Sequence, residues 1–134
     1  MNSRPLETSP TAWIVDDDAH VRAALAGFLQ VIGLPTRVFD SCEAFLDAYK
    51  ADQSGMLFVD LHLTGMSGLE LIEELQRRSS LMKMVLMTGA CSAECTTRAR
   101  NGGAVAVLQK PFSIKSLQPV LQDDHHPGDT PPGF

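Results

Sequence analysis

The chain of 134 residues has the length of one ordinary domain, with 44% hydrophobic and 20% charged residues. This composition excludes a disordered, collagen-like or membrane-spanning protein. No apolar run approaches the roughly 18 residues of a membrane helix, and residues 1–10 do not resemble a secretion signal, so we expect a cytoplasmic protein without membrane contact. Sixteen acidic and eleven basic residues give a net charge of −5, which argues against direct contact with nucleic acid.

Short apolar runs alternate with amphipathic stretches along most of the chain. The apolar runs predict buried strands at 12–15, 37–39, 56–59, 84–87 and 104–108. The amphipathic stretches predict helices at 21–32, 44–49, 69–78 and 93–100, the second of them capped by Ser41. Strands that are apolar throughout are typical of a parallel sheet with helices on both faces. We therefore expect an α/β domain over 11–122, with a disordered leader over 1–10 and a flexible tail or linker over 123–134.

The three cysteines are Cys42, Cys91 and Cys95, an odd number without the spacing of a zinc finger. Cys91 and Cys95 lie about one helical turn apart, but no histidine or third cysteine completes a metal set. We expect all three to be free thiols in a reducing compartment.

Polar side chains of different chemistry follow four of the predicted strands. Those residues are Asp16 and Asp17 after the first strand, Asp60 after the third, Thr88 after the fourth and Lys110 after the fifth. Each alone has a simpler explanation, such as a helix cap, a satisfied turn or a solvated charge. In a parallel α/β sheet, however, the loops that follow the strands converge at one edge. The joint placement therefore predicts a single polar site.

This set of residues suits phosphoryl transfer to a carboxylate. Three neighbouring carboxylates repel one another and an incoming phosphoryl group, so they need a hard divalent cation, for which Mg²⁺ is the best match. We expect Mg²⁺ to bridge Asp17, Asp60 and a phosphoryl oxygen while Asp60 attacks phosphorus in line. Lys110 and the Thr88 hydroxyl would then stabilise charge on the equatorial oxygens.

Five ordered motifs resemble the receiver domain of bacterial two-component response regulators, nearest the FixJ-like branch. They are IVDDD at 14–18, FVDLHL at 58–63, GMSG at 65–68, MTG at 87–89 and KPF at 110–112. The resemblance covers about residues 12 to 118 and implies a flavodoxin-like three-layer sandwich whose five parallel strands have the order 2-1-3-4-5. It also implies a sensor histidine kinase as the phosphoryl donor to Asp60, and a fused or separate output protein as the target of the signal.

The resemblance assigns further roles around the site. It makes Asp17 a direct metal ligand, lets Asp16 act mostly through water, and completes the protein's share with the backbone carbonyl of His62. It implies a cis peptide bond between Lys110 and Pro111. The domain would be a switch that catalyses only its own phosphorylation and dephosphorylation, not an enzyme for an external substrate. It would be a monomer or a weak, phosphorylation-dependent dimer.

Four positions depart from the pattern of the family. Val107 stands where relatives usually carry a Tyr or Phe that swings inward on phosphorylation, so we expect the signal to be relayed weakly or by shifts of residues 93–108. Thr64 replaces a common proline, which predicts a looser loop. Pro119 falls where the last helix should continue, so we expect that helix to be short, kinked or started late, with Ser116 as its cap, and this puts a dimer interface there in question. The small Ala90 leaves water room beside the phosphate.

Two other interpretations stay open at this point. A haloacid-dehalogenase-type phosphohydrolase uses a similar residue set, but it places its nucleophile after the first strand and normally adds a cap domain. Here the candidate nucleophile Asp60 follows the third strand, and we expect no cap domain in this length of chain. A degenerate receiver binds partners without being phosphorylated; the complete set of chemical residues disfavours it, although Val107 and Pro119 keep it open.

Overall fold

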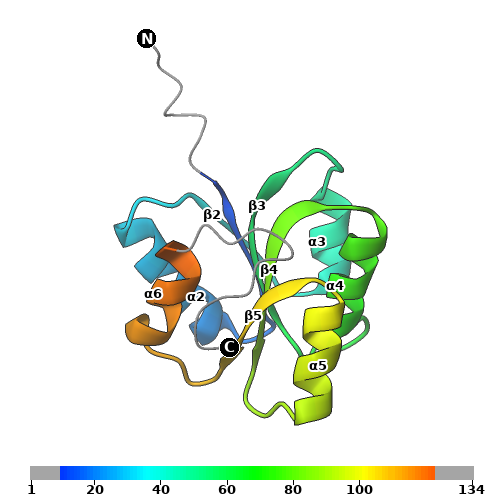
Figure 1. The fold of residues 1–134 in the computed structure, drawn as a ribbon. Coiled ribbons are helices and arrows are strands. Elements are labelled where there is room, and N and C mark those ends of the chain that lie inside the picture. The colour runs from blue at the N-terminus through cyan, green and yellow to red at the C-terminus, as the bar shows by residue number, and fades with distance from the viewer. Residues whose placement is uncertain (1–9, 123–134) are drawn as a thin grey trace.

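Five parallel strands form the central layer of the computed structural model, which describes residues 10–122 (Figure 1). The strands are β1 (Ala12–Val15), β2 (Thr36–Phe39), β3 (Ser54–Asp60), β4 (Leu81–Thr88) and β5 (Ala104–Gln109). Their order in the sheet is β2-β1-β3-β4-β5, which confirms the expected flavodoxin-like arrangement. The expected leader over 1–10 and tail over 123–134 lie outside the described residues, apart from Pro10.

Helices cover both faces of the sheet, as the apolar strands predicted. One face carries α2 (Ala19–Val31) and α6 (Ile114–Gln122), and the other carries α3 (Cys42–Ala48), α4 (Gly68–Arg77) and α5 (Ala93–Asn101) (Figure 1). Ser41 caps α3 as expected, because its hydroxyl accepts a hydrogen bond from the backbone N–H of Ala44 at 3.0 Å. Within residues 10–122, no helix is both long enough and apolar enough to cross a bilayer.

The core explains why the strands are apolar at consecutive positions. Successive side chains of a strand point to opposite faces of the sheet. In β3, Leu57 and Val59 pack with α3, α4 and α5, whereas Met56 and Phe58 pack on the opposite side with α2 and α6. All four side chains are buried. Both faces of the strand therefore contribute hydrophobic stabilisation, at roughly 1.5–3 kcal/mol for each fully buried large side chain.

The last helix differs in its start from one of the alternatives drawn from Pro119. It covers Ile114–Gln122 and continues through the proline, so the predicted late start with Ser116 as the cap is wrong. Ser113 takes the capping place: its hydroxyl accepts from the N–H of Ser116 at 3.3 Å, and its carbonyl accepts from the N–H of Leu117 at 3.2 Å. Leu117 is buried against the sheet, which anchors the helix ahead of the proline.

A close approach between α4 and the end of β3 depends on Gly68. A Cβ atom at this position would overlap the backbone carbonyl oxygen of Asp60 and lie 3.1 Å from the Cα atom of Leu61. The N–H of Gly68 donates to the carbonyl of Leu61 at 3.1 Å. The glycine thus allows α4 to pack directly beside the residue that ends β3.

We predict that Gly68→Ala lowers the free energy of unfolding by about 1–3 kcal/mol, because the added methyl group meets backbone atoms that cannot move aside. Gly27→Ala is the matched control, since it lies in α2 with no heavy atom within 4 Å of the added carbon. The control should gain up to about 1 kcal/mol from better helix propensity. Urea unfolding followed by circular dichroism measures both changes, and two variants of equal stability would contradict the close approach.

Candidate functional site

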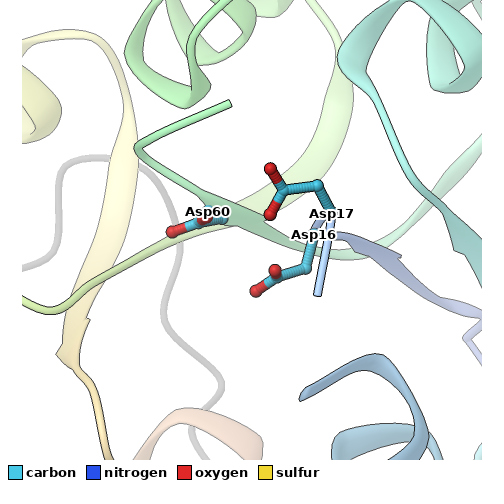
Figure 2. A group of neighbouring side chains, drawn as sticks. All are labelled: Asp16, Asp17 and Asp60. Carbon is cyan, nitrogen blue, oxygen red and sulfur yellow. The ribbon is translucent and has the colours of Figure 1, made fainter. Parts of the chain in front are cut away.

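Three carboxylates meet at the carboxyl ends of two neighbouring strands (Figure 2). Asp16 and Asp17 follow β1, and Asp60 is the last residue of β3, which pairs directly with β1. One oxygen from each carboxylate lies within 4.8 Å of the others. Asp16 and Asp60 are buried and Asp17 is exposed. The convergence of these three residues, predicted from sequence, is therefore observed.

The run of three aspartates divides into two roles. Asp18 caps α2, because its Oδ1 atom accepts from the backbone N–H groups of His20 at 2.8 Å and Val21 at 3.4 Å. These hydrogen bonds hold the pKa of Asp18 below its usual range. The N–H of Asp18 in turn donates to Oδ1 of Asp16 at 2.9 Å. The simple explanation of a helix cap thus holds for Asp18, while Asp16 and Asp17 belong to the carboxylate cluster.

Lys110 joins the cluster from the end of β5. Its Nζ atom lies 2.7 Å from Oδ2 of Asp16 and 3.3 Å from Oδ1 of Asp60. Burial alone would lower the pKa of Lys110, but the ion pairs with Asp16 and Asp60 outweigh that effect and raise it, so the side chain stays charged. The peptide bond between Lys110 and Pro111 is cis, as expected.

The buried position of Asp60 disfavours its negative charge. Burial raises the pKa of Asp60, and repulsion by Asp16 adds to the effect. Lys110 and a hydrogen bond from the backbone N–H of His62 oppose this change without cancelling it. His62 itself is exposed. One ammonium group therefore compensates only part of the repulsion among the carboxylates.

Thr88 ends β4 at the same edge of the sheet, and it is buried. Its hydroxyl donates to the carbonyl of Ala90 at 2.8 Å and accepts from the N–H of Ala90 at 3.1 Å. Its backbone carbonyl accepts from the N–H of Lys110 at 2.7 Å. The hydroxyl is thus bonded to the following loop, and it must change partners to reach a group on Asp60.

Two supporting residues were not identified from sequence. Glu43 of α3 accepts a hydrogen bond from the backbone N–H of Met66 at 2.9 Å, which anchors the loop after Asp60 and lowers the pKa of Glu43. Arg22 of α2 donates to the backbone carbonyl of Asp16 at 2.7 Å. The contact of Glu43 joins residues far apart in the chain, and neither side chain carries a local signal of its partner.

The prediction of three free thiols is wrong for two of the cysteines. Cys91 and Cys95 form a disulfide, with their Cα atoms 5.5 Å apart. Cys91 precedes Ser92, the N-cap of α5, and Cys95 lies in the first turn, so the winding of the helix brings the two side chains together. Cys42 is a free thiol as expected; it is buried, and burial raises its pKa to about 12.

The same fold occurs in known proteins. The family model of the response regulator receiver domain matches residues 12–122. The chain belongs to this family. The family membership confirms the resemblance carried by the five motifs.

Three relatives of this receiver domain illustrate the match. The transcriptional regulatory protein FixJ of Azorhizobium caulinodans is 38% identical over 104 residues, which cover 78% of this chain and 49% of FixJ. The structure of the response regulator StyR is 35% identical with a TM-score of 0.79, over 86% of this chain and 58% of StyR. A response regulator from Burkholderia pseudomallei, solved with a phosphorylated aspartic acid, calcium ion and citrate, is 29% identical with a TM-score of 0.72, over 84% of this chain and 66% of that one. The chain thus spans about half the length of FixJ.

The raised pKa of Asp60 generates a prediction about stability and pH. The folded state binds a proton at Asp60 more tightly than the unfolded state does, so ionised Asp60 lowers stability above the unfolded pKa. Each pH unit between the two pKa values is worth about 1.4 kcal/mol. In buffer with a metal chelator, we predict that Asp60→Asn is more stable than the parent at pH 7.5. The gap should shrink as the pH falls through the raised pKa.

Urea unfolding of the parent and Asp60→Asn across this pH range measures the gap. Asp52→Asn controls for the loss of an exposed carboxylate. A gap that is constant with pH, or an Asp60→Asn variant less stable than the parent at pH 7.5, would contradict the cost assigned to ionised Asp60.

Proposed function

We propose that this receiver domain accepts a phosphoryl group on Asp60 from a sensor histidine kinase in the cytoplasm, and that phosphorylation switches a protein–protein interaction. The main support is the meeting of Asp16, Asp17, Asp60 and Lys110 at one edge of the sheet. Such a site can hold a cation and a phosphoryl group next to a carboxylate nucleophile.

The donor set fits a hard divalent cation. The three carboxylates offer only oxygen ligands. Their combined negative charge exceeds the single positive charge of Lys110, and the exposed side chain of Asp17 leaves the site open to solvent. Oxygen ligands of this kind suit Mg²⁺. Asp17 and Asp60 would bind the ion directly, Asp16 mostly through water, and the backbone carbonyl of His62 would complete the protein's share. When bound, Mg²⁺ would neutralise the carboxylates and polarise the phosphoryl oxygens.

In this proposal, Asp60, Lys110 and Thr88 have different roles in the phosphoryl transfer. An oxygen of the Asp60 carboxylate attacks phosphorus in line, an acyl phosphate bond forms, and the bond from phosphorus to the histidine nitrogen of the kinase breaks. Lys110, already 3.3 Å from Asp60, can donate to a phosphoryl oxygen. The Thr88 hydroxyl can do the same once it leaves the carbonyl of Ala90. The phosphorylated aspartic acid of the Burkholderia relative supports this chemistry within the fold.

The output of the switch involves the side of the sheet that carries α5. Val107 is half-buried and packs against the core on that side, together with Cys95. Because a branched aliphatic side chain has no ring to rotate, we propose that the signal passes through movement of β4, α5 and β5 rather than through rotation of the side chain of Val107. The partner would be a fused or separate output protein, and the name of FixJ as a transcriptional regulator supports this type of output. In this proposal the domain itself makes no contact with nucleic acid and is a monomer or a weak, phosphorylation-dependent dimer.

Intact-mass analysis after incubation with acetyl phosphate and Mg²⁺ tests the proposed function. We expect the parent to gain the mass of one phosphoryl group, and Asp60→Asn or the parent with a chelator to gain none. Lys110→Met should label about 100-fold more slowly, because it removes one donor to the transferred group. Asp52→Asn is the matched control and should label like the parent.

Two results would contradict the proposal, the first from this experiment and the second from a separate assay of phosphate release. A parent that is never labelled would favour a degenerate receiver that acts as a phosphorylation-independent binding module. Steady release of phosphate from small phosphomonoesters would favour a phosphohydrolase.

A further inference from the structure

The Cys91–Cys95 disulfide lies where the chain passes from the end of β4, at the edge of the candidate site, into α5. Thr88 ends β4, and its hydroxyl is bonded to both backbone groups of Ala90. Cys91 follows Ala90 directly, and its sulfur is bonded across the first turn of α5 to Cys95. The disulfide therefore starts at the residue next to Ala90, whose backbone groups are hydrogen-bonded to the Thr88 hydroxyl.

Most side chains in the first turn of α5 are exposed or half-buried. Of its residues, Ala99 is the one that is fully buried. Near the carboxyl end of α5, Arg98 forms a bidentate ion pair with Glu73 of α4, at 2.9 and 3.0 Å. At the amino end, the hydroxyl of Ser92 caps the N–H of Cys95 at 3.0 Å. Because the first turn of α5 buries little surface, the disulfide adds a covalent restraint at the amino end of the helix.

We propose that Cys91 and Cys95 form a reversible dithiol–disulfide switch, which restrains residues 88–95 when oxidised and releases them when reduced. The effect of this switch on phosphorylation rests on the proposed function, whereas the redox reaction of the pair does not. In the cytoplasm proposed above, a disulfide that served only stability would be reduced, and those that form there are usually transient or redox-sensing.

The reaction is a two-electron exchange with an external dithiol. A thiolate of the dithiol attacks one sulfur of the pair and forms a mixed disulfide, and its second thiolate then displaces that cysteine. The dithiol is oxidised to a cyclic disulfide, and Cys91 and Cys95 each end with one electron and one proton more. An oxidised dithiol drives the reverse reaction. Both cysteines are partly exposed, so a small dithiol has access to the bond.

The third cysteine provides a contrast within the same chain. Cys42 is buried, its pKa is raised to about 12 mainly by burial, and its sulfur donates to the carbonyl of Ser67 at 3.7 Å. It is therefore a poor nucleophile and no competitor for either sulfur of the pair. Cys95 instead lies half-buried in the first turn of α5. The hydroxyl of Thr96 also donates to the sulfur of Cys91 at 3.5 Å.

The coupling to phosphorylation follows from the hydrogen bonds of Thr88. Its hydroxyl must leave Ala90 to reach a phosphoryl group on Asp60, which frees two backbone groups and lets the loop move. The disulfide ties the next residue to α5 and opposes that movement. We expect oxidation to slow the labelling of Asp60 several-fold, and reduction to restore it.

The redox reaction is tested on the full chain in mixtures of reduced and oxidised dithiothreitol. Samples are quenched in acid and alkylated under denaturing conditions with iodoacetamide. Intact-mass spectrometry then counts the alkylated cysteines. The parent should pass from three alkylated cysteines to one as the mixture becomes oxidising. Cys91→Ser and Cys95→Ser should keep two at every ratio, and Cys42→Ser should pass from two to none. Three alkylated cysteines in the parent at every ratio, or disulfide-linked dimers instead of the internal bond, would overturn the proposal.

The effect of the switch is tested by two measurements on the oxidised and reduced forms. Amide hydrogen exchange over residues 89–96 should be slower in the oxidised form, and this readout does not depend on phosphorylation. Labelling by acetyl phosphate should be several-fold slower in the oxidised parent and in oxidised Cys42→Ser, while Cys91→Ser should not respond to the dithiol. Equal exchange and equal labelling rates in both forms would overturn the switch. Absence of labelling in both forms would instead refute the proposed phosphoacceptor function, and the exchange measurement would still decide whether the pair restrains the segment.

Discussion

The ion pairs of Lys110 with Asp16 and Asp60 are the interactions on which the rest of the site depends. Two buried carboxylates next to each other repel, and the low polarity of their surroundings strengthens that repulsion. The ammonium group between them, 2.7 Å from Asp16 and 3.3 Å from Asp60, makes the arrangement compatible with folding. It does not neutralise the cluster, because Asp17 adds a third negative charge within 4.8 Å. The remaining charge makes the site receptive to a cation and, with that cation, to a phosphoryl group.

The fold brings these charges together through simple geometric constraints. Parallel strands end at one edge of the sheet, and β1 and β3 are neighbours although about forty residues separate them in the chain. Gly68 lets α4 approach the backbone at Asp60, and Glu43 holds the intervening loop from α3. The site is thus built on the ends of rigid elements, while its connection to α5 runs through the short segment that contains Thr88 and the disulfide.

Much of this architecture could be predicted from the sequence, for physical reasons. Apolar runs such as 56–59 are buried on both faces, so a run without alternation correctly indicated a parallel sheet between two helical layers. The position of Asp60 after such a strand placed its carboxylate at the loop edge without any knowledge of side-chain contacts. The cap at Ser41 was also predictable, because a serine directly before an amphipathic stretch is a local signal for the start of a helix. Its hydroxyl accepts from the N–H of Ala44, which has no partner within the helix.

The expectations that were wrong or missing fall into two kinds. In some, two local arrangements were equally compatible with the sequence, and in others the contact joins residues far apart in the chain. Ser113 and Ser116 are both plausible caps, and the burial of Leu117 decides in favour of Ser113. The spacing of Cys91 and Cys95 is equally compatible with two thiols and with one disulfide, and only the local winding at the start of α5 distinguishes them. The contact of Glu43 with the loop at Met66 joins residues 23 positions apart, and no pattern of composition or periodicity contains it.

The balance of charge at the carboxylate cluster can be measured directly by calorimetric titration of the domain with Mg²⁺. We predict a single binding site in the parent and an affinity at least about tenfold lower in Asp17→Asn, a loss of about 1.4 kcal/mol. Asp18→Asn is the neighbouring control: it keeps a residue that can cap α2, lies outside the cluster, and should bind like the parent. No binding by the parent, or equal affinities in Asp17→Asn and the parent, would contradict the claim that the unneutralised charge of these carboxylates makes the site.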